Sequence, residues 1–231
     1  MPEPTYGPWG CSRTKCWPVS RRFKRIRARR PRCAFSTTSH LRLRACREFQ
    51  LGSLAYRAKD EYDKAIADCT KAIELEPKNA TAYNRRGVMY AEKGDDDLAL
   101  ADYDRALELD RGYAAPYTNR GIIYMKRGQH EPAFWNYNRA IALDTKTFEN
   151  YYNRGIAYAE VKAYDRAIAD FTKALEILPK GTLAYIRRAQ VYLAKTEYDK
   201  AWSDVNKAQE LGGKIDEAFL IDLRKASGRE K

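Results

Sequence analysis

The sequence predicts an all-α solenoid: five stacked helical hairpins, a C-terminal capping helix, and a disordered basic N-terminal arm. Three observations support this prediction. The sequence repeats with a period of 34 residues, each repeat holds two stretches with helical apolar spacing, and residues 1–45 lack the repeat while carrying an excess of basic charge. A repeat of this length is one supersecondary unit, which buries its apolar face only against its neighbours.

The register of the repeat is set by tyrosines that follow one another at intervals of 34 residues. These are Tyr83, Tyr117, Tyr151 and Tyr185. Four further columns align with them: a small residue from Gly87, a second tyrosine from Tyr90, and alanines from Ala99 and Ala106. A weaker copy lies upstream, where Phe49 replaces the tyrosine. The predicted units are 46–79, 80–113, 114–147, 148–181 and 182–215, followed by a capping helix and tail at 216–231.

Each unit divides into two helices joined by a short turn. Tyr83, Gly87 and Tyr90 fall at i, i+4 and i+7, which places them on one helix face. The second half repeats this spacing at Ala99 and Ala106. Glycine inside a helix costs roughly 1 kcal/mol relative to alanine. Glycine at the same column of three repeats therefore indicates a point where the two helix backbones approach closely.

At these columns the sequence resembles the tetratricopeptide repeat (TPR) family, whose unit carries an aromatic, a small residue, a tyrosine, two alanines and a late proline at these offsets. The resemblance extends from Cys46 to Ile215, although the late proline remains only at Pro77 and Pro179. It implies five tetratricopeptide-type hairpins whose first helices line a concave groove. In such proteins, asparagines in the groove hydrogen-bond the backbone of an extended peptide.

The basic charge belongs to the arm. Residues 1–47 hold eleven Arg and two Lys against the single Glu3, a net charge of +12 that equals the charge of the whole chain. A twin-arginine pattern at Arg21 and Arg22 lacks the apolar stretch that export requires. The arm also resembles a mitochondrial transit peptide, which makes mitochondrial location the alternative to a cytoplasmic one. A disordered run and a mis-assigned start are further interpretations.

The arm also offers a second hypothesis for function. Residues 19–30 form a basic stretch that, as a short helix, has the charge to bind nucleic acid or anionic lipid. No run of the sequence approaches the ~18 apolar residues of a membrane-spanning helix, so the chain is predicted not to be transmembrane.

Catalytic and metal-binding machinery is not apparent in the sequence. It holds two histidines, His40 and His130, and neither a phosphate-binding loop nor a nucleophile elbow. The five cysteines show no zinc or disulfide spacing, and Cys69 occupies a column of buried aromatic residues. We expect no cofactor, no metal site and no enzymatic activity.

Two polar columns lie on each predicted first helix. Arg86, Arg120, Arg154 and Arg188 each precede Asp102, Asn136, Asp170 or Asp204 by sixteen residues, which favours salt bridges inside each hairpin over a ligand ladder. The column one residue earlier holds Arg85, Asn119, Asn153 and Arg187, for which no partner within the repeat is evident. This favours contact with a ligand, and the alternative is that an asparagine there caps a neighbouring helix. The predicted peptide-binding residues are Asn84, Arg85, Thr118, Asn119, Met125, Lys126, Tyr152, Asn153, Arg187 and Gln190.

The sequence thus predicts a non-catalytic scaffold or adaptor that binds a peptide segment of another protein. It has no lysine at Asn84, Thr118, Tyr152 or Ile186, where chaperone-binding members of the family clamp a terminal carboxylate. An internal peptide segment, with acidic residues near Arg85 and Arg187, is therefore the expected ligand.

Removing residues 1–45 should leave the fold unchanged, because the arm lacks the repeat register and carries unbalanced charge. The shortened chain, starting at Cys46, should match the full chain in helical circular dichroism and melting temperature. A melting temperature lower by several degrees would show that the arm packs on the repeats.

Overall fold

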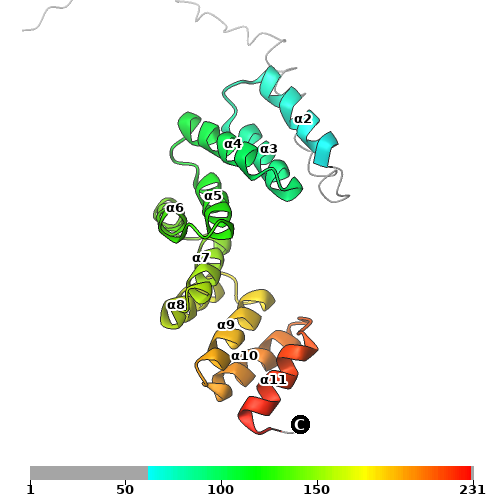
Figure 1. Cartoon of the computed structure of the whole chain (residues 1–231), viewed down its shortest axis with the longest axis vertical. Coiled ribbons are helices and arrows are strands. Elements are labelled where there is room, and N and C mark those ends of the chain that lie inside the picture. The colour runs from blue at the N-terminus through cyan, green and yellow to red at the C-terminus, as the bar shows by residue number, and fades with distance from the viewer. Residues whose placement is uncertain (1–61, 230–231) are drawn as a thin grey trace, which may run out of the picture. The chain divides into compact units, whose positions relative to one another are not determined.

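The computed structural model describes residues 62–229, which form ten α-helices and no β-strand (Figure 1). The predicted arm and the first helix of the first repeat lie outside the described residues. The helices are α2 (Tyr62–Leu75), α3 (Ala80–Lys93), α4 (Asp96–Leu109), α5 (Ala114–Lys126), α6 (His130–Leu143), α7 (Phe148–Glu160), α8 (Tyr164–Ile177), α9 (Thr182–Ala194), α10 (Tyr198–Glu210) and α11 (Glu217–Ser227).

Consecutive helices pack in pairs, which confirms the predicted all-α repeat architecture. The hairpins are α3–α4, α5–α6, α7–α8 and α9–α10, and each second helix also packs on the first helix of the next hairpin. The first helices α3, α5, α7 and α9 contact one another in succession. Within residues 62–229 no two second helices do so, so the first helices form a continuous surface, here called the first-helix face.

The core of each hairpin is built from alanines and one large ring. The alanine columns at Ala99 and Ala106 are fully buried in every described repeat. A Cβ atom placed on Gly121 would lie 2.6 Å from Cε1 of Tyr137, and Gly87 meets Tyr103 in the same way. The small column therefore makes room for a buried aromatic ring from the second helix. At Gly87 the backbone oxygen of Ala99 on the second helix also lies close, 3.2 Å from the added Cβ, so both the ring and the backbone exclude a larger residue there.

The last hairpin supports this explanation through a paired change. Ala189 stands where the other hairpins have glycine, and Val205 stands where they have Tyr or Phe. Both residues are fully buried in one apolar cluster. A larger residue on the first helix thus accompanies a smaller one on the second. Cys69 occupies the ring column of the first repeat and is also fully buried, as predicted.

The turn inside each hairpin contains one residue in the left-handed conformation, again with a period of 34. Gly94 and Gly128 hold this position in two hairpins, with φ of 95° and 69°. Lys162 and Thr196 hold it in the other two, with φ of 60° and 59°. Only glycine adopts this conformation without steric cost, so the third and fourth of these turns carry strain that the first two avoid.

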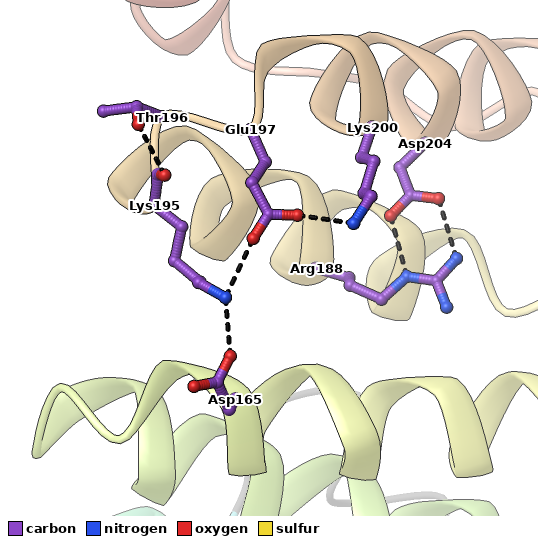
Figure 2. Close-up of polar contacts among 7 residues, drawn as sticks. All are labelled: Asp165, Arg188, Lys195, Thr196, Glu197, Lys200 and Asp204. Atoms are coloured by element: carbon purple, nitrogen blue, oxygen red, sulfur yellow. Dashed lines mark hydrogen bonds and ion pairs between the residues drawn. The ribbon is translucent and has the colours of Figure 1, made fainter.

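Arginine–aspartate pairs tie the two helices of three hairpins together, as predicted. Nε and Nη2 of Arg188 each donate to one oxygen of Asp204 at 2.8 Å (Figure 2). Arg86 and Arg154 bind Asp102 and Asp170 in the same bidentate way. The remaining guanidinium nitrogen of each arginine, Nη1, donates to a side chain of the preceding hairpin. Arg188 Nη1, for example, donates to Thr172 Oγ1. One guanidinium thus links three helices.

The third repeat departs from this pattern, which corrects the prediction for that column. Asn136 replaces the aspartate, and its amide donates to the backbone oxygen of Pro132 instead. Arg120 instead pairs with Asp104 of the preceding hairpin. Among residues 62–229, Arg120 Nε and Asn136 Oδ1 are buried and have no hydrogen-bond partner.

A further set of ion pairs joins neighbouring hairpins at a spacing of 30 residues. Lys195, at the end of α9, donates to Asp165 at the start of α8 and also pairs with Glu197 (Figure 2). Lys93 and Asp63 form the same bridge between α3 and α2. The carboxylates of Asp63 and Asp165 are largely exposed. An exposed ion pair contributes at most about 1 kcal/mol to folding stability.

Replacing Gly121 by Leu should destabilise the protein by roughly 1–3 kcal/mol, because the new side chain must displace the buried ring of Tyr137. Urea unfolding followed by circular dichroism measures the change. The double variant Gly121→Ala, Tyr137→Val copies the last hairpin. It should be much more stable than the single variant Gly121→Ala. Wild-type stability of Gly121→Leu would refute the assigned contact.

Replacing Thr196 by Gly should stabilise the protein by roughly 0.5–1 kcal/mol, because glycine removes the steric cost of the left-handed turn and loses only part of that gain to its freer unfolded chain. The reverse change, Gly94→Thr, should destabilise it. The urea midpoint of each variant is compared with that of the wild type. Midpoints equal to the wild-type value would show that neither turn is strained.

Candidate peptide-binding groove

The predicted site lies on the first-helix face. Arg85, Asn119, Asn153 and Arg187 come one each from α3, α5, α7 and α9, and these helices contact one another in that order. Their 34-residue spacing places them at one position of successive hairpins. The four side chains are therefore presented by four consecutive first helices.

Asn119 has a partner in the preceding repeat. Its Nδ2 donates to Asn84 Oδ1 at 3.1 Å, and Asn84 Nδ2 in turn donates to the hydroxyl of Tyr113 at 3.3 Å. Asn84 is only 7 % exposed. The predicted groove wall at Asn84 is thus a buried polar link between α3, α5 and the loop before α5, and it leaves the Oδ1 atom of Asn119 available as an acceptor.

Thr118 takes part in a second link of this kind. Its hydroxyl donates to Asn150 Oδ1 at 2.7 Å, and Asn150 Nδ2 donates to the backbone oxygen of Asp144 at 3.1 Å. Thr118 and Asn150 are 5 % and 3 % exposed. A buried amide with both ends satisfied fixes the position of its neighbours. Thr118 and Asn150 therefore hold α5, α7 and the loop between α6 and α7 in place.

A pocket of about 670 Å³ opens beside these links, between the N-terminal halves of α5 and α7. Asn119 and Asn153 both line it, together with Thr118. Its charged lining residues are all acidic: Asp110, Asp144 and Glu149. Hydrogen bonds from the Thr147 hydroxyl and from the backbone N–H of Lys146 lower the pKa of Asp144, so its carboxylate stays ionised near neutral pH.

Arg187 and Gln190 meet at a second, smaller pocket of about 330 Å³ between α7, α8 and α9. Nη1 of Arg187 donates to Gln190 Oε1 at 3.1 Å. This pocket is lined on its other sides mainly by apolar residues, including Ile156 and Val191. The structure therefore brings these two predicted residues together, apart from the pocket that holds Asn119 and Asn153.

The remaining predicted wall residues serve the stack in other ways. Met125 packs against the buried cluster around Tyr137. Tyr152 stacks on Phe148 with ring centroids 5.3 Å apart. Lys126 is bound to Asp96 at 2.9 Å, one of the pairs between neighbouring hairpins. Neither of the two pockets is lined by these three side chains.

Sequence reasoning missed Asn150 and the acidic residues of the larger pocket. A signal for Asn150 was present, because its column otherwise holds small or apolar residues: Ala82, Pro116 and Ala184. The acidic residues Asp110 and Asp144 lie in loops between hairpins, outside the helix columns that were compared.

No helix in residues 62–229 is long and apolar enough to cross a membrane. In the same residues, no group of three or more His, Cys, Asp or Glu side chains is placed to hold a metal ion.

Comparison with solved structures places the chain among helical repeat proteins. A crystal structure of MamA protein is 26 % identical, with a TM-score of 0.58 over 72 % of this chain and 91 % of that one. PilF of Pseudomonas aeruginosa is 22 % identical, with a TM-score of 0.72 over 81 % and 86 %. YrrB, described as a TPR protein with an unusual peptide-binding site, is 24 % identical, with a TM-score of 0.53 over 71 % and 84 %.

Family models agree with these neighbours, whereas comparison with curated protein sequences gave no match. Models described as tetratricopeptide repeat match residues 121–205 and 80–113, and one described as TPR repeat matches residues 54–94. Together they cover more than half of the chain. The matches and the fold support a protein–protein interaction scaffold, and the chain belongs to the tetratricopeptide repeat family.

Proposed function

We propose that the protein is a non-catalytic adaptor that holds a peptide segment of a partner protein along its first-helix face. The segment lies across Arg85, Asn119, Asn153 and Arg187. The observation that carries this proposal is the pocket of about 670 Å³ where Asn119 and Asn153, from two successive hairpins, line one cavity.

Amide side chains suit the recognition of an extended backbone, because each offers a donor and an acceptor. Within the described residues Asn153 makes no hydrogen bond, and Asn119 uses only its Nδ2 atom. A peptide backbone lying over the pocket would use the remaining amide groups. The buried link through Asn84 holds the Asn119 side chain in position before the ligand arrives, which reduces the entropy cost of binding. The link between Thr118 and Asn150 fixes helices α5 and α7, which carry the two asparagines.

The charges along the face indicate the pattern of the peptide. Arg85 and Arg187 stand at the two ends and favour acidic residues there. The central pocket is lined by Asp110, Asp144 and Glu149 and favours a polar or basic side chain. The proposal does not include a clamp on the terminal carboxylate of a peptide, because no lysine occupies the column that holds Asn84 and Thr118.

The alternative function is binding of nucleic acid or anionic membrane through the basic arm. The net charge of +12 in residues 1–47 favours this candidate. The two functions differ in salt dependence, because counterion release makes arm binding weaken steeply with salt. A partner bound by the first-helix face should remain bound from 50 to 200 mM NaCl and should still bind a chain that lacks the arm.

The double variant Asn119→Ala, Asn153→Ala should abolish partner capture, because it removes the amide groups that contact the peptide backbone. Loss of the Asn119–Asn84 bond should cost only about 0.5–1.5 kcal/mol of stability. The partner is identified by affinity capture on the full chain, and its binding is then measured by titration calorimetry.

The matched control is Asn206→Ala, which removes an exposed amide from the second helix α10 and should leave binding unchanged. Circular dichroism checks that all variants are folded. Normal binding by the folded double variant would move the site away from the first-helix face.

A further inference from the structure

Four positions in or beside one cavity, three in the third repeat and one at the end of the second, differ from the matching columns of other repeats. This pocket of about 810 Å³ lies between the second helices α4 and α6, with Tyr117 and Arg120 of α5 also lining it. It is therefore on the opposite side of the hairpins from the predicted groove residues, none of which line it. We call it the outer pocket.

The first departure is an exposed tryptophan. Trp135 is 58 % exposed and lines the outer pocket. The same column holds Ala101, Ala169 and Ser203 in the other hairpins, and those residues are also exposed. Its ring meets the edge of Tyr117 at a centroid distance of 6.0 Å. Tryptophan is among the residues that most often dominate binding energy at protein interfaces, so Trp135 is a candidate for contact with a ligand in this pocket.

The second and third departures each remove a carboxylate that neutralises an arginine. In the second, fourth and fifth repeats, the basic residue at the column of Arg139 pairs with a glutamate three residues later. These pairs are Arg105–Glu108, Lys173–Glu176 and Lys207–Glu210. In the third repeat that glutamate is Ala142. Among the described residues Arg139 makes no ion pair or hydrogen bond, and it lines the outer pocket.

Arg120 has lost its partner in the same way. The aspartate that binds this column elsewhere is Asn136 here, and Arg120 Nε is buried without a hydrogen-bond partner. A buried unsatisfied donor is costly and calls for an explanation. The fourth departure adds positive charge, because Arg111 stands where two other repeats have proline, and it too lines the pocket without an ion pair in residues 62–229.

The two carboxylates that line the pocket do not neutralise these groups. Asp104 is bound to Arg120 Nη1 at 2.7 Å, and Glu108 is bound to Arg105. Arg111 and Arg139 therefore present free guanidinium groups beside an exposed indole. Arginine binds carboxylates in bidentate geometry, and tryptophan and arginine are the residues that most often dominate binding energy at protein interfaces.

We infer that the outer pocket binds an acidic peptide segment of a partner protein, with carboxylates on Arg139 and Arg111 and an apolar side chain against Trp135. Its charged lining residues, three arginines and two carboxylates, give a net charge of only +1. The carboxylates would repel a continuous run of phosphates, and residues 48–231 hold equal numbers of basic and acidic residues. Both facts favour a short acidic peptide over nucleic acid.

The test uses changes that copy the neighbouring repeats, so that folding is preserved. The variant Trp135→Ala, Asn136→Asp, Ala142→Glu gives the third repeat the side chains found in the second. A phage-displayed random dodecapeptide library is selected on the full-length wild-type protein. We expect enrichment of peptides that carry two or more Asp or Glu beside an apolar residue.

The selected peptides are then measured by fluorescence anisotropy. Binding should weaken at least tenfold in the triple variant and stay within twofold in the groove variant Asn119→Ala, Asn153→Ala. The matched control Glu176→Ala frees Lys173 at the same column of the next repeat, where no tryptophan is present, and should not change binding. Circular dichroism confirms that each variant is folded.

Other outcomes overturn the proposal. The proposal is wrong if the wild-type protein enriches no peptides relative to the triple variant, or if it enriches uncharged or basic peptides. It is also wrong if the selected acidic peptides bind the triple variant equally well. Binding of single-stranded RNA that the triple variant loses would assign the pocket to nucleic acid instead. Wild-type dimers in sedimentation velocity that the triple variant dissociates would assign it to a second copy of this chain.

Discussion

The fit between a small residue on each first helix and a buried ring on each second helix is the constraint on which the structure depends. Gly121 and Tyr137 show it most clearly, because even one methyl group on the glycine would lie 2.6 Å from the ring. The fit sets the separation of the two helices, and the paired change to Ala189 and Val205 shows that the two positions vary together. Because the hairpins have this contact in common, their first helices can stack into one continuous face.

Polar side chains then fix each hairpin relative to the next. Arg86, Arg154 and Arg188 each bind an aspartate in their own hairpin and a side-chain oxygen in the preceding one. Each guanidinium also lies 5.7–5.9 Å from two tyrosine ring centroids. Because contacts in such an array run between neighbours, its stability is a sum of local terms. One repeat can therefore depart from the pattern while its neighbours support it.

That local independence allows the two faces of the array to differ, and we propose a different site on each. On the first-helix face, buried links through Asn84 and Thr118 hold Asn119 and Asn153 beside an acidic pocket. On the other side, the third repeat lacks two carboxylates and has a tryptophan. Within residues 62–229 this leaves Arg139 without an ion pair and Arg120 Nε without a hydrogen-bond partner beside a pocket. The two sites differ in charge, so two different peptide segments would be selected.

The sequence by itself determined the architecture. The 34-residue period and the helical spacing of Tyr83, Gly87 and Tyr90 are sufficient, because each repeat carries the same local information and contacts only its neighbours. The arginine–aspartate pairs were predictable for the same reason. The sequence also places Arg85, Asn119, Asn153 and Arg187 in one helix column, since a column of a regular array maps to one face.

Only the tertiary structure decided which of those residues line a cavity. Asn119 and Asn153 meet at a pocket that Thr118 also lines. Asn84 and Thr118 are buried in links to Tyr113 and Asn150. Sequence periodicity could not show this, because these bonds join different hairpins and loops at spacings that depend on how the helices stack. The outer pocket has the same origin. Its residues come from three helices and from the loop between α4 and α5. The loss of a partner at Arg120 or Arg139 can be recognised only when the partners in the other repeats are seen in place.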